Sequence, residues 1–197
     1  MNLYAKMIIV LTLVGLISGG CLSVVDLLTR ERIELNRQKE IEEAIGKVVP
    51  GTKNYTAAVE EKDFTVYKAK DEQENLIGYA IYAKGTGFQD IITLMFGTDP
   101  DLNLINSLTI LEQKETPGLG AKITNREEFL RFWEDRECGQ KLTLRKPAVE
   151  TKEELSPSEV NTITGATISS QKVLDIVNLS LEQVKSLKNE GKLGGEE

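Results

Sequence analysis

The pattern of hydrophobic and polar positions changes abruptly near the start of this chain. Residues Met7 to Val25, "MIIVLTLVGLISGGCLSVV", carry no charge and are rich in Ile, Leu and Val. A helix needs roughly 20 apolar residues to cross a bilayer, so this segment predicts a transmembrane helix. The charged segment from Leu27 to Val49 predicts a helix that continues out of the membrane and ends at Pro50-Gly51.

Two other interpretations of the apolar segment remain open. A cleaved signal peptide has a hydrophobic region of about 7–15 residues and then small residues of the A-x-A type, which this segment matches poorly. The sequence "SGGC" at Ser18 to Cys21 is similar to a lipoprotein cleavage box, although Ser18 stands where such boxes usually carry an aliphatic residue. We expect a retained helix, with lipidation at Cys21 as the main alternative.

Beyond Gly51, short apolar runs are separated by turn residues. Strand-like runs begin at Phe64, Leu76, Asp90 and Leu104. The stretch "NREEFLRFWED" from Asn125 has a capping start and aromatic side chains at helical spacing, and Ile168 to Lys188 predicts a longer amphipathic helix. Strands first and helices later, without regular alternation, predict an α+β domain: an antiparallel sheet with a C-terminal helix.

These patterns predict four parts in the chain. We expect an N-terminal tail and transmembrane helix at residues 1–28, a helical stalk at 29–50, a globular domain at 51–190 and a flexible tail at 191–197. A length of 197 residues fits one globular domain with such additions.

The composition excludes several kinds of chemistry. The chain has no histidine, which removes Ser-His-Asp and Cys-His pairs and the common zinc sites. Its two cysteines, Cys21 and Cys138, support neither a disulfide framework nor a cysteine cluster, and Cys138 is expected as a lone buried or half-buried thiol. A net charge of -7 argues against nucleic acid as a partner. We therefore expect no catalytic triad and no metal site.

Three glycine-bearing stretches interrupt the predicted scaffold. "KGTGFQD", Lys84 to Asp90, is explained by a bulge or a hairpin loop when taken alone. In "KETPGLGAK", Lys114 to Lys122, Pro117-Gly118 sets a turn and Gly120 lets a backbone come close to another group, although a purely structural turn is also an explanation.

The third stretch, "NTITGATISS" from Asn161, leads directly into the last predicted helix. Thr167 is expected at the N-cap, and Ser169 and Ser170 follow it. Free backbone N–H groups and the positive end of the helix dipole converge at such a place, which favours a phosphate group. A plain N-cap is the alternative.

Together the three stretches carry a family resemblance. "TGAT" followed by "ISS", with "ETPGLGAKI" and "GTGFQDIITLMFGTD" upstream, resembles the FMN-binding domain found in the G subunit of the Rnf complex and in its relative, the C subunit of the Na⁺-pumping NADH:quinone oxidoreductase. The resemblance covers nearly the whole chain in the same order, including the single N-terminal helix. The "ETPGLG" form and the short length are more similar to the Rnf protein.

The resemblance implies a covalent flavin. In that family the last threonine of the motif, here Thr167, carries FMN through a phosphoester bond that a dedicated flavin transferase installs from FAD. The helix start would then stabilise the phosphate. The other implied cofactor-binding residues are Thr164, Gly165, Ala166, Ser169, Glu115, Thr116, Gly118, Leu119 and Gly120. Lys122 would either steady a reduced, anionic flavin or remain solvated.

Two positions depart from the family pattern. Asn161 stands where the family usually has an aspartate, six residues before the modified threonine. Gln113 stands where the family often has a histidine. The first departure bears on recognition by the transferase, and the second on whatever the imidazole does in other members.

The resemblance also implies a function and a location. It indicates an electron-carrying redox component of a membrane complex that links ferredoxin and NAD to Na⁺ or H⁺ movement, with the other Rnf subunits as partners. The N-terminus would be cytoplasmic and the FMN domain extracytoplasmic at the plasma membrane. The alternatives are a noncatalytic assembly subunit and a stand-alone extracytoplasmic FMN reductase.

Charge counting favours the opposite orientation. One lysine, Lys6, precedes the apolar segment, whereas Arg30, Arg32, Arg37 and Lys39 follow it. The positive-inside rule would therefore keep the domain in the cytoplasm, but long domains translocate largely regardless of charge. The family resemblance decides our expectation.

Overall fold

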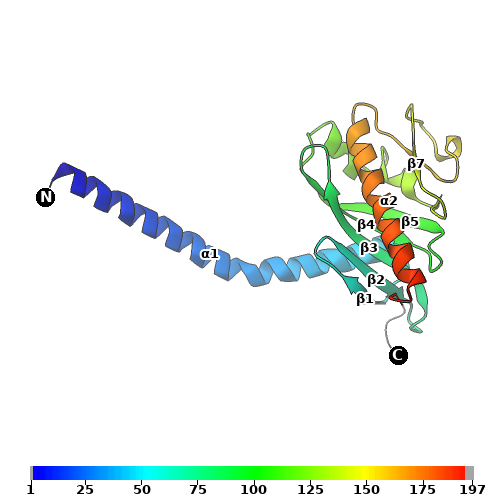
Figure 1. The fold of residues 1–197 in the computed structure, drawn as a ribbon, viewed down its shortest axis with the longest axis horizontal. Helices are drawn as coiled ribbons and strands as arrows, with labels where there is room; N and C mark the ends of the chain where they lie inside the picture. The colour runs from blue at the N-terminus through cyan, green and yellow to red at the C-terminus, as the bar shows by residue number, and fades with distance from the viewer. Residues whose placement is uncertain (1, 194–197) are drawn as a thin grey trace. The chain divides into compact units, whose positions relative to one another are not determined.

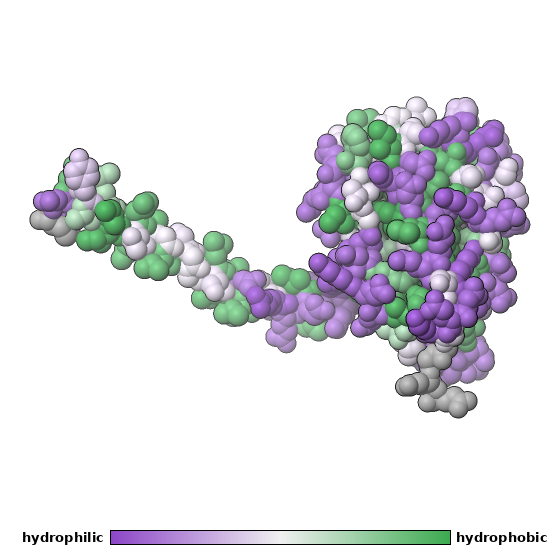
Figure 2. Space-filling model, in the orientation of Figure 1, coloured by the Kyte–Doolittle hydropathy of each residue, from purple (hydrophilic) through white to green (hydrophobic). Residues whose placement is uncertain are grey.

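The N-terminal part of the protein is one long helix. The computed structural model describes residues 2–193, and the chain divides into two compact units, Met1–Glu42 and Glu43–Glu197. Helix α1, Leu3–Val48, runs through the apolar and the charged segments and ends just before Pro50, as predicted (Figure 1). The apolar side chains from Met7 to Val25 are exposed (Figure 2), and the helix is long and apolar enough to cross a membrane.

The globular unit is built on a six-stranded antiparallel sheet. The strands lie in sequence order: β1 (Asn54–Glu60), β2 (Phe64–Lys70), β3 (Leu76–Thr86), β4 (Ile91–Thr98), β5 (Leu104–Glu112) and β6 (Arg136–Glu137). Four of them, β2 to β5, are the predicted runs. The other two were not predicted, because the side chains of β1 are mostly exposed and β6 has only two residues.

A second, smaller sheet and three short 3₁₀ helices complete the connections after β5. Strands β7 (Thr143–Arg145) and β8 (Glu159–Asn161) pair in parallel. The 3₁₀ helices are η1 (Gly120–Thr124), η2 (Leu130–Trp133) and η3 (Lys152–Glu154).

The predicted helix from Asn125 is wrong. The capping residue does act, because Asn125 Oδ1 accepts the N–H groups of Glu127 and Glu128 at 2.9 and 3.2 Å. However, turns follow, and only η2 is helical. Because a segment this short has little helical stability of its own, tertiary packing decides its conformation. Phe129, Phe132 and Trp133 are all buried. The rings of Phe129 and Trp133 pack edge-to-face, with their centroids 5.8 Å apart.

Helix α2, Thr167–Asn189, lies across one face of the large sheet, as the predicted amphipathic pattern requires (Figure 1). Alternate residues of β3 and β4 form the core on this face. The apolar stripe of α2 is buried in the same core and consists of Val173, Leu174, Ile176, Val177, Leu181 and Val184. Burying each such side chain contributes about 1.5–3 kcal/mol, so this stripe fixes the helix to the sheet.

The other face of the sheet contacts the end of α1 and the residue that follows it. Val48 and Val49 lie against Gly97 of β4, and both valines are buried. Tyr82 and Met95 alternate with the core residues of their strands and are buried as well. The last turn of α1 is therefore part of the globular unit.

At the other end of the chain, Leu193 is buried in the core, although the sequence predicts a flexible tail there. The rest of that tail, residues 194–197, lies outside the part of the chain that the structure describes.

Cys138 gives a pH-dependent prediction. The thiol is buried and donates to the carbonyl of Leu102 at 3.4 Å, and burial raises its pKa to about 11. An unfolded cysteine has a pKa of about 8.5, so the folded state keeps a proton that the unfolded state releases. The protonated thiol therefore contributes its full stabilisation at pH values below the unfolded pKa of about 8.5. This stabilisation is lost as the pH rises through the folded pKa.

Urea unfolding in detergent, followed by the fluorescence of Trp133, the single tryptophan, measures this effect. Between pH 7.5 and 10.5 we expect the wild type to lose more free energy of unfolding than Cys138→Ala, which has no thiol to titrate. Equal losses in the two proteins would show that the buried thiol has no such influence.

Candidate functional site

The three glycine-bearing stretches meet at the side chain of Glu115. Its Oε1 accepts the backbone N–H groups of Phe88 and Gln89 at 2.8 and 3.1 Å. Its Oε2 accepts the hydroxyl of Ser169 at 2.7 Å. Glu115 is 4% exposed. One buried carboxylate therefore joins the loop between β3 and β4, the loop after β5 and the first turn of α2.

Two glycines make room for this carboxylate. A Cβ at Gly87 would lie 2.4 Å from Glu115 Oε1. A Cβ at Gly120 would lie 2.7 Å from Glu115 Oε2 and 2.6 Å from Ser169 Oγ. Both positions are thus restricted to glycine by close approach, in agreement with the role expected for Gly120.

A pocket of about 260 Å³ lies at this junction. Most of the predicted site residues line it: Glu115, Thr116, Leu119, Gly120, Gly165, Ala166, Thr167 and Ser169. Two further residues of the lining, Phe88 and Ile168, were not predicted. Phe88 is a single apolar residue in a loop, and Ile168 was predicted only as the start of a helix, so the pattern of the sequence carried no signal that either lines a pocket.

The two unpredicted residues and Leu119 give the pocket an apolar rim. Phe88 is 57% exposed, Leu119 51% and Ile168 53%. Each comes from a different one of the three stretches. The site therefore combines a polar floor, at Glu115 and Ser169, with half-exposed apolar side chains around it.

The remaining two predicted residues lie outside the lining of this pocket. Gly118 is in the turn before η1 and has a φ of 76°. Thr164 lines a neighbouring pocket of about 480 Å³ together with Thr162. The hydroxyl of Thr162 is buried and has no hydrogen-bond partner among the described residues. The three threonines of the motif therefore do not converge, and only Thr167 lines the pocket of Glu115.

Thr167 is the first residue of α2, and the N-cap is Ala166, one residue earlier than predicted. The carbonyl of Ala166 accepts the N–H of Ser170 at 3.0 Å and so begins the helix. The hydroxyl of Ser170 closes the same turn, because it donates to Ala166 O at 3.0 Å and accepts from Ile163 N at 3.1 Å. The hydroxyl of Thr167 is therefore not used as a cap.

Two residues singled out in the sequence lie outside the lining of the pocket of Glu115. Gln113 Oε1 accepts the N–H of Glu115 at 2.6 Å and so steadies the backbone of the carboxylate. Lys122 pairs with Glu128 at 2.7 Å and lines the neighbouring pocket with Thr164.

Asn161 is held by a two-way amide clamp. Its Oδ1 accepts the N–H of Val149 at 2.9 Å, and its Nδ2 donates to the carbonyl of the same residue at 2.8 Å. Asn161 is buried. An aspartate in its charged form could accept the first bond but could not donate the second.

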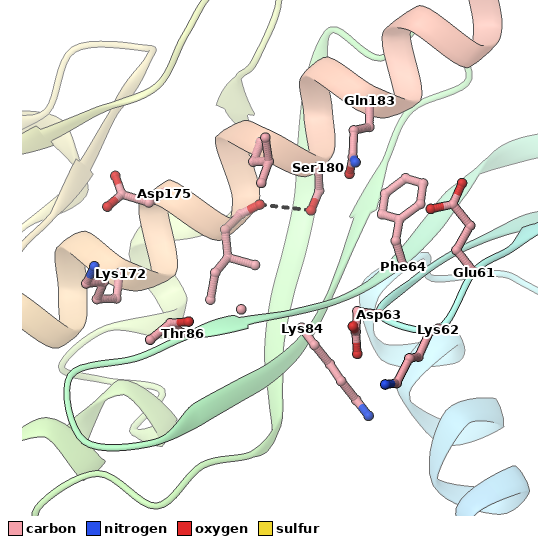
Figure 3. A pocket seen from close by; sticks show the side chains of 13 residues that line it. Glu61, Lys62, Asp63, Phe64, Lys84, Thr86, Lys172, Asp175, Ser180 and Gln183 are labelled. Atoms are coloured by element: carbon pink, nitrogen blue, oxygen red, sulfur yellow. Dashed lines mark hydrogen bonds between the residues drawn. The ribbon is translucent and has the colours of Figure 1, made fainter.

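A larger pocket of about 450 Å³ lies on the side of α2 that faces the β1–β2 loop and β3 (Figure 3). It contains none of the predicted site residues. Its charged side chains are balanced: Lys62, Lys84 and Lys172 against Glu61, Asp63 and Asp175. The hydroxyl of Ser180 is used within α2, where it donates to Ile176 O at 2.8 Å. This pocket indicates no particular ligand.

The chain is similar in sequence to known proteins. Residues 87–182 match the family model of the FMN-binding domain. The chain is 27% identical over 188 residues to the G subunit of the ion-translocating oxidoreductase complex of Methanosarcina acetivorans, covering 92% of this chain and 94% of the relative. It is 30% identical over 123 residues to the G subunit of the Na⁺-translocating ferredoxin:NAD⁺ oxidoreductase complex of Acetobacterium woodii, covering 62% of this chain and 56% of that relative.

A solved structure has the same fold. The crystal structure of Shewanella oneidensis NqrC matches with a TM-score of 0.54 and 22% identity, over 69% of this chain and 72% of that chain. The matched family region contains Phe88, Glu115 and Thr167, one from each of the three segments of the pocket. The part of the chain that builds most of the pocket around Glu115 is thus similar to the FMN-binding domain.

Proposed function

We propose that the chain is the flavin-carrying, electron-transferring G subunit of a membrane-bound, ion-translocating ferredoxin:NAD oxidoreductase of the Rnf type. FMN is attached through a phosphoester to Thr167. The observation that carries the proposal is the position of Thr167, which lines the pocket at the first turn of α2 in an FMN-binding domain. The relatives named above are subunits of such redox complexes.

The residues present fit an FMN group. The N–H groups in the first turn of a helix have no partner within the helix, and with the helix dipole they favour a phosphate. Gly120 has no Cβ, which leaves room for Glu115 and Ser169 in the wall of the pocket. Phe88, Leu119 and Ile168 are the apolar residues that would hold the ring system. The bound flavin would supply the redox chemistry, and the chain supplies its position and surroundings.

Attachment requires a second enzyme. Glu115 is the only ionisable side chain that lines the described pocket, and its oxygens already accept bonds from the loop and from Ser169. The pocket thus offers no free base for the hydroxyl of Thr167. This supports maturation by a flavin transferase that uses FAD.

The membrane arrangement completes the proposal. Helix α1 and the membrane complexes of the relatives support membrane association. We propose the parts 1–28, 29–50, 51–190 and 191–197 as membrane segment, stalk, FMN-binding domain and C-terminal tail. The last turn of the stalk helix, with Val48, and Leu193 of the tail are packed on the domain. The N-terminus is cytoplasmic, the domain is extracytoplasmic, and the other subunits of the complex are its partners.

Thr167→Ala should abolish covalent flavin and leave stability nearly unchanged. Because Ala166 and Ser170 form the start of α2, the free energy of unfolding should change by no more than about 0.5 kcal/mol. Intact mass and peptide mapping of chain purified from its native membrane measure the flavin. Thr164→Ala is the matched control and should keep the flavin, since Thr164 lines the other pocket.

Flavin mapped to Thr162 or Thr164 would refute the assignment. Native wild-type chain without flavin, by mass and by in-gel fluorescence, would favour a noncatalytic assembly subunit. Flavinylated chain that purifies without other membrane subunits would favour a stand-alone reductase.

Asn161→Asp should destabilise the protein at neutral pH. A buried carboxylate would face the carbonyl of Val149 without a proton to donate, which costs about 1–3 kcal/mol. Burial raises the pKa of such an aspartate above its unfolded value of about 3.9, so the loss is small below that pH and grows as pH rises. Urea unfolding of wild type and variant at pH 4 and pH 7 measures the difference.

Asn178→Asp is the matched control, because Asn178 clamps the backbone of Leu142 in the same two-way manner, with both bonds at 3.0 Å. Both variants should lose stability alike. Only Asn161→Asp should raise the extent of flavinylation, in a host whose transferase prefers the common aspartate motif. A fall in flavinylation specific to Asn161→Asp would instead indicate a transferase matched to asparagine.

The orientation is tested by labelling a single cysteine. Glu72 has a side chain that is 71% exposed, on the turn between β2 and β3. We expect Glu72→Cys, in a Cys21→Ala and Cys138→Ala background, to react with a membrane-impermeant maleimide in intact cells. The background without Glu72→Cys is the control. Labelling that appears only after permeabilisation would place the domain in the cytoplasm.

A further inference from the structure

We infer that Glu115 is a positioning residue that also makes the flavin harder to reduce. Its buried carboxylate holds the walls of the pocket together and places a negative charge there that no cation among the described residues balances. The second part rests on the proposed function, because it concerns the flavin attached at Thr167. The first part concerns the chain alone.

The bonding of Glu115 leaves little capacity for a cofactor. A carboxylate has about four acceptor sites, and Phe88, Gln89 and Ser169 occupy three of them. Two of the donors are backbone groups of the loop between β3 and β4, and the third is on α2. The family resemblance implies that Glu115 binds the cofactor. Its contacts instead assign it to the structure of the pocket wall.

The charge of Glu115 has no cationic partner among the described residues. The nearest lysines in sequence are used elsewhere: Lys114 pairs with Asp90 at 3.7 Å and Lys122 with Glu128 at 2.7 Å. The carboxylate of Glu115 is stabilised instead by the dipoles of two backbone N–H groups and one hydroxyl. A partly balanced carboxylate in a buried setting acts on its surroundings more strongly than one in water.

The consequence concerns reduction. A flavin that takes up two electrons and one proton gains one negative charge on its ring. A carboxylate in the wall of the same pocket disfavours that gain, so the charge of Glu115 makes the reduction potential more negative. Removing one of its hydrogen-bond donors leaves the charge less balanced and should lower the potential further.

Two variants separate charge from shape. Glu115→Gln can keep every bond, since its Oε1 can accept the two N–H groups and its Nε2 can donate to Ser169 Oγ, while the charge is lost. Ser169→Ala keeps the charge and removes one donor. Asp175→Asn is the control, because it removes a negative charge from α2 at the pocket between α2 and the β1–β2 loop, away from Glu115 (Figure 3).

The full chain is purified with its flavin in detergent, its occupancy at Thr167 is established by peptide mapping, and the potential is measured by titrating flavin absorbance with dithionite. We expect a more positive potential for Glu115→Gln, a more negative one for Ser169→Ala and no change for Asp175→Asn. A purely structural role of Glu115 would not shift the reduction potentials of Glu115→Gln and Ser169→Ala in opposite directions. Full occupancy with an unchanged potential in Glu115→Gln overturns the charge role, whereas absence of flavin from wild type overturns the proposed function.

The positioning role is tested without flavin, by hydrogen–deuterium exchange on the unflavinylated full chain. Glu115→Ala should speed exchange at the amides of Phe88 and Gln89 at least tenfold, and Glu115→Gln should not. Unchanged exchange in Glu115→Ala overturns the positioning role. The fluorescence of Trp133 shows whether Glu115→Ala folds. If it does not fold, Glu115→Gln tests the positioning role instead. Because the glutamine can keep all the hydrogen bonds of Glu115, tenfold faster exchange at the amides of Phe88 and Gln89 in Glu115→Gln overturns that role.

Discussion

A buried carboxylate must find hydrogen-bond donors within the fold, and at Glu115 this requirement organises the whole site. The donors come from residues 27 and 54 positions away in the sequence, Phe88 and Ser169. The bonds can form only where the neighbouring backbone has no Cβ, which restricts positions 87 and 120 to glycine. The three glycine-bearing stretches are thus one structural unit, and the carboxylate is the reason that they occur together.

The large sheet determines where these stretches can meet. The hairpin between β3 and β4 presents the loop with Phe88, and the end of β5 leads into Glu115. The apolar stripe of α2 is packed on the same face of the sheet, so the first turn of the helix reaches the same place. Rigid elements carry the core, and the loops at their ends carry the site, which is the usual division in small-molecule-binding domains.

Periodic hydrophobic patterns predicted most strands of the large sheet and helix α2. The features of the site that were not predicted, and the helix that was predicted wrongly, depend on contacts between distant parts of the chain. Strands β2 to β5 and helix α2 follow periods that one sequence segment displays by itself. The segment after Asn125 has a correct cap, yet the burial of three aromatic side chains overrides its helical pattern. Within the site, glycine and threonine motifs located most of the pocket. The bonds of Glu115 and the rim residues Phe88 and Ile168 depend on contacts between distant segments, for which a single sequence has no local signal.

The motif around Thr167 is anchored on both sides, and the anchors define what it can do. Before it, Asn161 clamps the backbone of Val149. After it, Ser170 closes the first turn of α2 and Ser169 is bonded to Glu115. These side chains use their polar groups to hold the backbone, whereas the hydroxyl of Thr167 has no hydrogen-bond partner among the described residues and is not needed to begin the helix. If Thr167 is modified as proposed, its oxygen must be available to another enzyme without unfolding the helix that it starts. An N-cap at Ala166 meets that condition, whereas an N-cap at Thr167 would not.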